Sequence, residues 1–219
     1  MQSDAPRAVL WDMDGTLVDS SEQHLQAWQE AMAAEGRTYT EADHAAVFGM
    51  RNDSILRKLI DPEISDAEIA RIADAKERRY RQLVAEGGIE ALPGVRAWLE
   101  KLKTAGWRMA VASSAPSENL GAIIAALSLE GVFDTLVSGE QVSFGKPHPA
   151  VFLAAAEAVG VPPERCVVVE DAPPGVEAGK RGGMQVIGVG PRHAELGADV
   201  GVERLDQLPE DAFDRLVGR

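Results

Sequence analysis

The 219-residue chain has little of three features that would point to particular protein classes. Its single cysteine, Cys166, cannot form an internal disulfide, which favours a reducing compartment. Only 22 Lys and Arg residues stand against 35 Asp and Glu residues, and the net charge of −13 leaves no basic surface for nucleic acid. No apolar run approaches the roughly 20 residues that span a bilayer, and residues 1–7 lack the regions of a secretory signal. We therefore expect a cytoplasmic protein whose partners include neither nucleic acid nor a membrane.

The most informative segment begins with a short apolar run at residues 8–11, which is typical of a buried strand. Asp12 and Asp14 follow directly, and Gly15 then allows the backbone to turn away sharply. Asp is common in turns after strands, so this motif alone is also compatible with a purely structural role. In an open parallel sheet, however, ligands bind beyond the carboxyl ends of the strands, which is where these two carboxylates would lie.

Strand-length apolar segments alternate with helical patterns after residue 88. The expected strands are residues 109–112, 135–138, 166–170, 185–189 and 199–202, and the expected helices lie near residues 94–105, 120–127, 149–159, 176–180 and 205–216. This alternation predicts an α/β fold with a Rossmann-like three-layer α/β/α core and a parallel sheet. Residues 19–88 do not fit, because helical spacing continues through the whole segment. We expect residues 19–88 to form a small helical cap domain inserted after the first strand, and residues 1–18 and 89–219 to form the core domain.

Polar side chains follow three of the expected strands directly. They are Asp12, Asp14, Ser113, Glu170 and Asp171. If the three strands are parallel neighbours, these side chains meet at one edge of the sheet. Lys146 lies in a long loop at residues 139–149, and loops of that length tend to be functional.

Several carboxylates in one place repel each other unless a cation intervenes, and a hard divalent ion such as Mg²⁺ is the natural one. Lys146 and Ser113 could then bind the remaining oxygens of a phosphoryl group. A carboxylate can also act as the nucleophile and form an acyl phosphate. The combination therefore favours phosphoryl transfer.

The motifs Asp12-Met-Asp-Gly-Thr16, Ser113-Ser114, Lys146-Pro147 and Glu170-Asp171 resemble, in order and combination, those of the haloacid dehalogenase superfamily. The resemblance covers almost the whole chain. Within subfamily I it is similar to the β-phosphoglucomutase-like and sugar-phosphate phosphatase branch, whose helical cap is inserted straight after the first motif. Trp11 stands where Phe is usual, and Ala150 stands where an acidic residue is frequent.

The resemblance implies a role for each motif residue. Asp12 matches the nucleophile that becomes an aspartyl-phosphate, and Asp14 matches the acid that protonates the leaving oxygen and then activates water. Ser113 and Lys146 match the phosphate-binding groups. The implied Mg²⁺ shell consists of Asp12, Asp14 through its carbonyl, Glu170 and Asp171.

The expected cap contains three candidate substrate contacts. His24 and Trp28 share one helix face, so His24 either packs in the cap or lines the entrance and contacts substrate. Arg51 and Asn52 could hold distal hydroxyls or a second phosphate of a substrate. Alternatively, Asn52 or Asp53 simply caps the following helix.

We therefore expect a Mg²⁺-dependent phosphatase, monomeric or weakly dimeric, that acts on a small phosphorylated metabolite, a sugar or polyol phosphate. A β-phosphoglucomutase is the main alternative. Mutases usually carry a lysine before the cap-loop glycine, and this chain has Phe48 at that position. Arg51 could still contact the second phosphate that a mutase must hold. A phosphonate hydrolase would need a Schiff-base lysine in the cap, for which Lys58 is the nearest candidate. A non-catalytic binding protein would commonly lack one of the motif acids.

Overall fold

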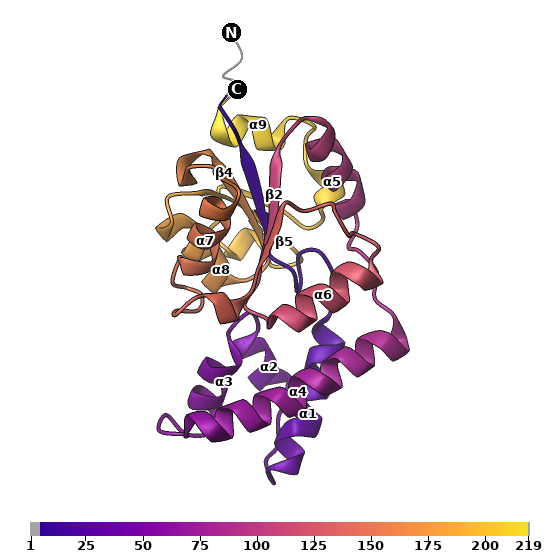
Figure 1. The fold of residues 1–219 in the computed structure, drawn as a ribbon, viewed down its shortest axis with the longest axis vertical. Helices are drawn as coiled ribbons and strands as arrows, with labels where there is room; N and C mark the ends of the chain where they lie inside the picture. The colour runs from indigo at the N-terminus through magenta and orange to yellow at the C-terminus, as the bar shows by residue number, and fades with distance from the viewer. Residues whose placement is uncertain (1–4, 219) are drawn as a thin grey trace.

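One parallel sheet organises the core of the computed structural model, which describes residues 5–218. The expectation drawn from residues 1–7 therefore lies mostly outside the described residues. The strands run in the order β3-β2-β1-β4-β5-β6, and all their pairings are parallel. Their bounds are β1 (Ala8–Trp11), β2 (Arg108–Ala112), β3 (Thr135–Val137), β4 (Cys166–Glu170), β5 (Gln185–Val189) and β6 (Val200–Val202). This architecture confirms the predicted α/β, Rossmann-like fold (Figure 1).

Helices cover both faces of the sheet. Helices α5 (Val95–Thr104), α6 (Ser117–Ala126) and α9 (Ala212–Val217) share one core cluster with the sheet, and α7 (Ala150–Ala158) and α8 (Pro173–Arg181) share the other. Alternate residues of β1 divide between the layers, with Val9 and Trp11 in the first cluster and Ala8 and Leu10 in the second. Because β1 is buried on both faces, its sequence is an unbroken apolar run.

Short 3-10 segments occur in the loops of the core: η1 (Gly139–Gln141), η2 (Pro163–Arg165), η3 (His193–Glu195) and η4 (Leu205–Gln207). The closing helix predicted over residues 205–216 is divided into η4 and α9. Leu208 adopts an extended conformation, with φ −66° and ψ 138°, because the following residue is Pro209. Helical backbone therefore resumes only after the proline.

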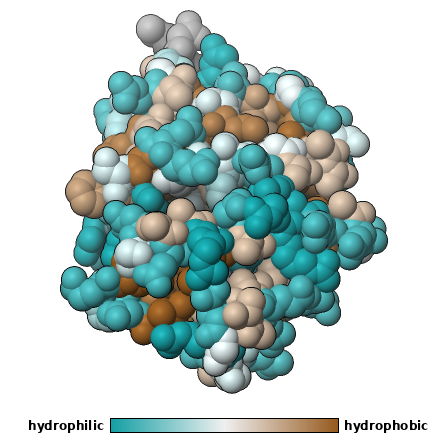
Figure 2. Space-filling view, turned by 60° about the horizontal axis from the view of Figure 1, so that its bottom comes forward, coloured by the Kyte–Doolittle hydropathy of each residue, from teal (hydrophilic) through white to brown (hydrophobic). Residues whose placement is uncertain are grey.

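Between β1 and α5 the chain forms four helices, α1 (Ser21–Ala34), α2 (Glu41–Val47), α3 (Asn52–Leu59) and α4 (Asp66–Gly87), which we call the helical insertion. It lies beyond the carboxyl ends of the strands, at the bottom of Figure 1. The insertion has a hydrophobic cluster of its own that includes Trp28, Leu56 and Ile72. Most of the surface turned forward in Figure 2 is hydrophilic, with hydrophobic residues in small patches. Among residues 5–218, no helix combines the length and apolar character that a membrane crossing requires.

Two chain segments connect the helical insertion to the core, and they are hydrogen bonded to each other. Leu92 N donates to Leu17 O at 2.9 Å, and Val18 and Ala91 form an antiparallel bridge. Gly15 N donates to Val18 O at 2.7 Å. The two connecting segments therefore run side by side between the core and the helical insertion, next to the residues that follow β1.

Candidate active site

Strand register decides which polar side chains meet at the edge of the sheet. Trp11, the last residue of β1, lies opposite Val111 in β2 and Val169 in β4. Asp12 N then donates to Val169 O at 3.0 Å, which carries the β1 register one residue further. Asp12 and Glu170 consequently lie side by side at the carboxyl ends of the two central strands, where open α/β sheets bind their ligands.

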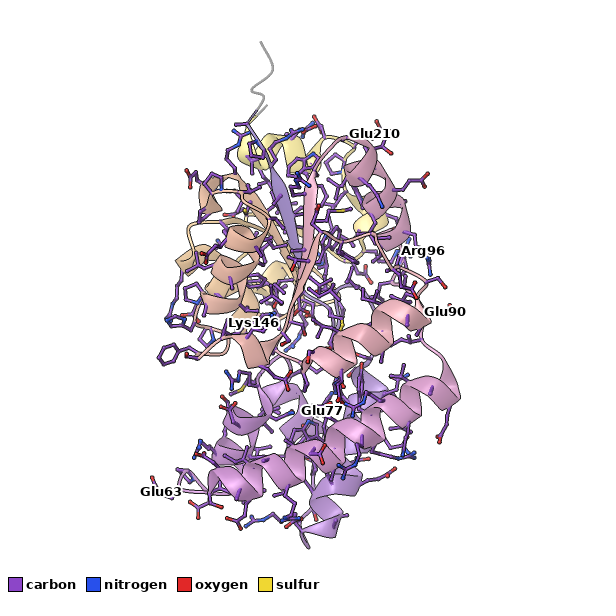
Figure 3. All side chains as sticks on the ribbon, in the orientation of Figure 1. Glu63, Glu77, Glu90, Arg96, Lys146 and Glu210 are labelled. Atoms are coloured by element: carbon purple, nitrogen blue, oxygen red, sulfur yellow. The ribbon has the colours of Figure 1, made fainter. Side chains whose placement is uncertain are left out.

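Lys146 joins these two carboxylates. Its ammonium contacts Asp12 Oδ1 and lies 2.7 Å from Glu170 Oε1, and only 5% of the residue is exposed. Burial raises the pKa of Asp12 to about 8, although the Lys146 ammonium acts in the opposite direction. Burial alone would lower the pKa of Lys146, but the two carboxylates outweigh it and the pKa rises. Figure 3 shows Lys146 at the end of the core that faces the helical insertion.

A third carboxylate completes an acidic cluster. Asp12, Glu170 and Asp171 each offer a ligand oxygen within 4.8 Å of the others. Burial, followed by the charge of Glu170, raises the pKa of Asp171 well above its usual value. Glu170 Oε2 is held in place by the backbone N–H groups of Asp171 and Ala172, each at 2.8 Å. Two buried carboxylates and a half-buried one that repel each other fit a hard divalent cation, so this cluster could bind a metal.

Gly15 makes room for this cluster. Its φ is +85°, and a Cβ atom at this position would lie 2.0 Å from Asp171 Oδ2. A side chain at residue 15 would therefore both strain the backbone and displace a candidate metal ligand. The glycine of the Asp-x-Asp-Gly motif is required here by geometry.

We expect Gly15→Ala to destabilise the fold by more than the backbone cost of about 1–2 kcal/mol for a left-handed L-residue. Gly36→Ala is the matched control, because Gly36 has φ +68° and nothing lies within 4 Å of its Cβ position. Urea unfolding with and without Mg²⁺ measures both variants. Equal losses of stability in the two variants, with equal stabilisation of both by Mg²⁺, would contradict a steric clash between residue 15 and Asp171.

Asp14 has different partners from Asp12. Its Oδ1 accepts from Ser20 Oγ at 2.5 Å, from Tyr80 OH at 3.2 Å, and lies 3.2 Å from His24 Nε2. The His24 ring stacks on Tyr80 with centroids 3.9 Å apart. Burial would raise the pKa of Asp14, but His24 and Ser20 outweigh it and lower the pKa to about 2. The structure thus places His24 against Asp14 and not only within the packing of the insertion.

Sequence reasoning missed Lys76 and Glu77 of α4, because they belong to a run of charged residues that is typical of a solvated surface. Both are buried, with 2% and 5% exposed, and Lys76 Nζ lies 2.8 Å from His24 Nδ1 and from Glu77 Oε1. A signal was present, since Lys76 continues the helical stripe of Ile69 and Ile72.

The remaining candidates lie near the junction with the core. Asn52 Nδ2 donates to Glu77 Oε1 at 2.7 Å, and Arg51 donates to Val142 O at 2.8 Å in the loop that carries Lys146. Helix α3 starts at Asn52 with Arg51 as its N-cap and no capping side chain. The alternative that Asn52 or Asp53 caps this helix is therefore wrong, because the helix begins earlier than that alternative requires.

Asp12, Asp14 and Ser113 line one small cavity together with His24 and Lys76. Its volume is about 50 Å³, which is room for a water molecule or two and not for a sugar phosphate. A larger cavity of about 710 Å³ lies beside Asp171, between the connecting segments and the loops after β5 and β6. Because Asp12, Asp14 and Ser113 all line the small cavity, we take it as the candidate site; residues of the helical insertion form its other wall.

Comparisons with known proteins agree with this arrangement. The family described as haloacid dehalogenase-like hydrolase matches residues 6–183. The phosphorylated carbohydrates phosphatase of Thermotoga maritima is 35% identical over 184 residues, which cover 82% of this chain and 83% of that protein. The β-phosphoglucomutase of Bacillus subtilis is 30% identical over 208 residues, covering 92% and 91%. The crystal structure of CbbY from Rhodobacter sphaeroides in complex with phosphate is 30% identical, with a TM-score of 0.86 and coverage of 95% and 99%.

These matches confirm the resemblance that the four motifs indicated. They extend over the core and the helical insertion alike, since the matched residues run through both. The chain belongs to the haloacid dehalogenase-like hydrolases.

Proposed function

We propose that the protein is a Mg²⁺-dependent phosphatase of small phosphorylated metabolites, sugar or polyol phosphates, and that it works through an aspartyl-phosphate on Asp12. The observation that carries this proposal is the buried Asp12 carboxylate, which contacts the Lys146 ammonium and lies in one cluster with the Glu170 and Asp171 carboxylates. Asp14 lines the same cavity with separate partners. The names of relatives that act on phosphorylated carbohydrates support the substrate class.

In the first half-reaction a carboxylate oxygen of Asp12 attacks phosphorus, and the bond from phosphorus to the ester oxygen breaks. The leaving oxygen takes a proton from Asp14. In the second half-reaction Asp14 takes a proton from water, which attacks the phosphoaspartate and releases inorganic phosphate. The lowered pKa keeps Asp14 ionised, which is the form that can take a proton from water. The approach of a phosphoryl dianion would raise this pKa and favour the protonated form that gives a proton to the leaving oxygen.

The residues around Asp12 fit both a metal and a phosphoryl group. Asp12, Asp171 and the Asp14 carbonyl would hold Mg²⁺, with Glu170 supporting the site, and the ion would neutralise charge on the phosphoryl oxygens. Lys146 and Ser113 would bind the other oxygens. In the structure Ser113 Oγ accepts from Ala115 N at 3.1 Å, which leaves its hydroxyl hydrogen available.

We further propose that residues 19–88 act as a cap over a core formed by residues 1–18 and 89–219. The separate hydrophobic cluster of the helical insertion supports this division. The cavity of about 50 Å³ is too small for a sugar phosphate, so we expect the cap to move before a substrate enters. A monomeric or weakly dimeric state and a cytoplasmic location stay predictions.

The test is phosphate release from a panel of esters with Mg²⁺, including fructose 1-phosphate, hexitol phosphates and β-glucose 1-phosphate. We expect hydrolysis of sugar or polyol phosphates with kcat/KM of at least about 10⁴ M⁻¹s⁻¹, the lower end for ordinary enzymes. Conversion of β-glucose 1-phosphate to the 6-phosphate, primed by the bisphosphate and without net phosphate release, would instead identify a mutase. No reaction with any ester would contradict both.

A further inference from the structure

A buried carboxylate that the proposed chemistry does not use lies where the helical insertion meets the core. Glu77 Oε1 accepts from Lys76 Nζ at 2.8 Å and from Asn52 Nδ2 at 2.7 Å, both within the insertion. Its Oε2 accepts from Asn119 Nδ2 at 2.6 Å, and Asn119 belongs to α6 of the core. Figure 3 shows Glu77 on α4, facing the junction below the core. One carboxylate therefore joins two residues of the insertion to one residue of the core.

The orientation of the Asn119 amide follows from its partners. Arg81 of α4 donates to Asn119 Oδ1 at 3.0 Å, so the amide nitrogen faces Glu77. Arg81 also pairs with Glu118 of α6 at 2.7 Å. Asn119 is fully buried, with both ends of its amide engaged by the same helix of the insertion. The helical insertion and the core are therefore joined here by buried, specific hydrogen bonds.

The same carboxylate acts on the reactive groups through Lys76. A lysine ammonium can only donate, so His24 Nδ1, 2.8 Å from Lys76 Nζ, must accept. The proton of a neutral His24 ring then lies on Nε2, which points at Asp14 Oδ1 at 3.2 Å. Lys76 in this way fixes both the tautomer of His24 and the side of the ring that faces Asp14.

The ammonium of Lys76 needs a counter-ion, because a buried unpaired charge is strongly unfavourable. Glu77 supplies it within 2.8 Å, and Lys76 is 2% exposed. Burial alone would raise the pKa of Glu77, but the charge of Lys76 and the hydrogen bonds from Lys76 and Asn52 outweigh it, and the pKa lies below its usual value. Glu77 is thus ionised while it accepts from Asn119.

We propose that Glu77 is a positioning residue that latches the helical insertion onto the core through Asn119 and, through Lys76 and His24, aligns Asp14. This inference rests on the proposed function of the site. Movement of the insertion away from the core would break the bond between Glu77 and Asn119, and hydrogen bonds to charged groups are the stronger ones. Closure of the cap and alignment of Asp14 are therefore coupled through one carboxylate.

The test exchanges the donor and acceptor across the junction. Glu77→Gln removes the charge beside Lys76, and Asn119→Asp places two carboxylates face to face. We expect each to lower kcat/KM for fructose 1-phosphate by about 10- to 100-fold, from the usual range for a hydrogen bond to a charged group. In the double variant the new amide donates to the new carboxylate, which still accepts from Arg81, so we expect at least about tenfold recovery over either single variant.

Two further readouts separate positioning from a general structural role. Because p-nitrophenolate departs without a proton, kcat/KM for p-nitrophenyl phosphate should fall much less than for fructose 1-phosphate in both single variants. Asp74→Asn, one turn away on the exposed face of α4 in an ion pair with Arg78, is the matched control and should change neither value. Equal losses with both esters, or a double variant no better than the singles, would overturn the proposal.

Small-angle X-ray scattering with Mg²⁺ and orthovanadate tests the latch without turnover. We expect the parent protein and the double variant to be compact and the two single variants to show a larger radius of gyration. Single variants as compact as the parent would overturn the latch, whatever the activity measurements show. A parent protein without activity on any ester, but with the expected scattering, would contradict the proposed function and leave the latch supported.

Discussion

Asp12→Asn is expected to lower kcat for phosphate release by about 10⁴-fold or more, the size of effect seen when a nucleophile is removed. The reason is chemical, because a carboxamide cannot form the acyl phosphate on which both half-reactions depend. The substitution keeps the shape of the side chain, and Lys146 keeps its contact with Glu170 at 2.7 Å. Steady-state phosphate release with and without the substitution, at saturating Mg²⁺, measures the effect.

Loss of activity in this variant should not come from unfolding. The folded-state pKa of Asp12, about 8, lies above the usual 3.8, so the native state holds a proton more tightly than the unfolded chain. Ionising Asp12 as the pH rises from about 4 to 8 therefore destabilises the metal-free fold, and asparagine removes that cost. We expect the metal-free variant to melt no lower than the parent at pH 8. A large fall in its melting temperature would make the activity loss uninformative about chemistry and contradict the pKa argument.

Removal of divalent metal is expected to abolish turnover and to lower thermal stability. Asp12, Glu170 and Asp171 have few means of offsetting their mutual repulsion beyond Lys146, so a bound cation should stabilise the fold by about 2.7 kcal/mol at a hundredfold excess over its Kd. Both Asp12 and Asp171 have raised pKa values, and a metal must displace their protons. Mg²⁺ affinity should therefore increase as the pH rises toward 8.

Calorimetric titration with Mg²⁺ between pH 6 and 8 measures this dependence, and EDTA followed by Mg²⁺ checks that activity returns. Asp171→Asn should weaken binding and lose the stabilisation by Mg²⁺. Asp199→Asn is a control, because Asp199 is a carboxylate of the core outside the acidic cluster. Unchanged activity in EDTA, or affinity that does not vary with pH, would contradict a metal site at these carboxylates.

The sequence allowed the sheet and its polar edge to be predicted because both follow from local patterns. The strands at residues 8–11, 166–170 and 185–189 are built on short apolar runs, and the structure gives them those bounds. The polar residues at their carboxyl ends were expected to meet if the strands were parallel neighbours, and β1 and β4 are neighbours, which brings Asp12 and Glu170 together. The division of the closing helix was missed, although Pro209 marked it.

The network above the site could not be predicted in the same way. Lys76 and Glu77 stand beside two arginines, and local composition indicated a solvated helix face. Their burial depends on α1 and α6 packing against α4, which are contacts between segments far apart in the chain. Asn119, 42 residues from Glu77, carries no signal of its own. Such a network is specified by tertiary packing and not by any pattern within one helix.

In the proposed mechanism the phosphoryl group passes through Asp12. Rapid acid quench of a single turnover with labelled substrate, followed by tryptic digestion, tests this directly, because residues 8–37 form one peptide without internal Lys or Arg. We predict label on that peptide, lability to hydroxylamine as expected for an acyl phosphate, and no label in Asp12→Asn. A burst of product with no labelled peptide, or label on a different peptide, would contradict the proposed mechanism.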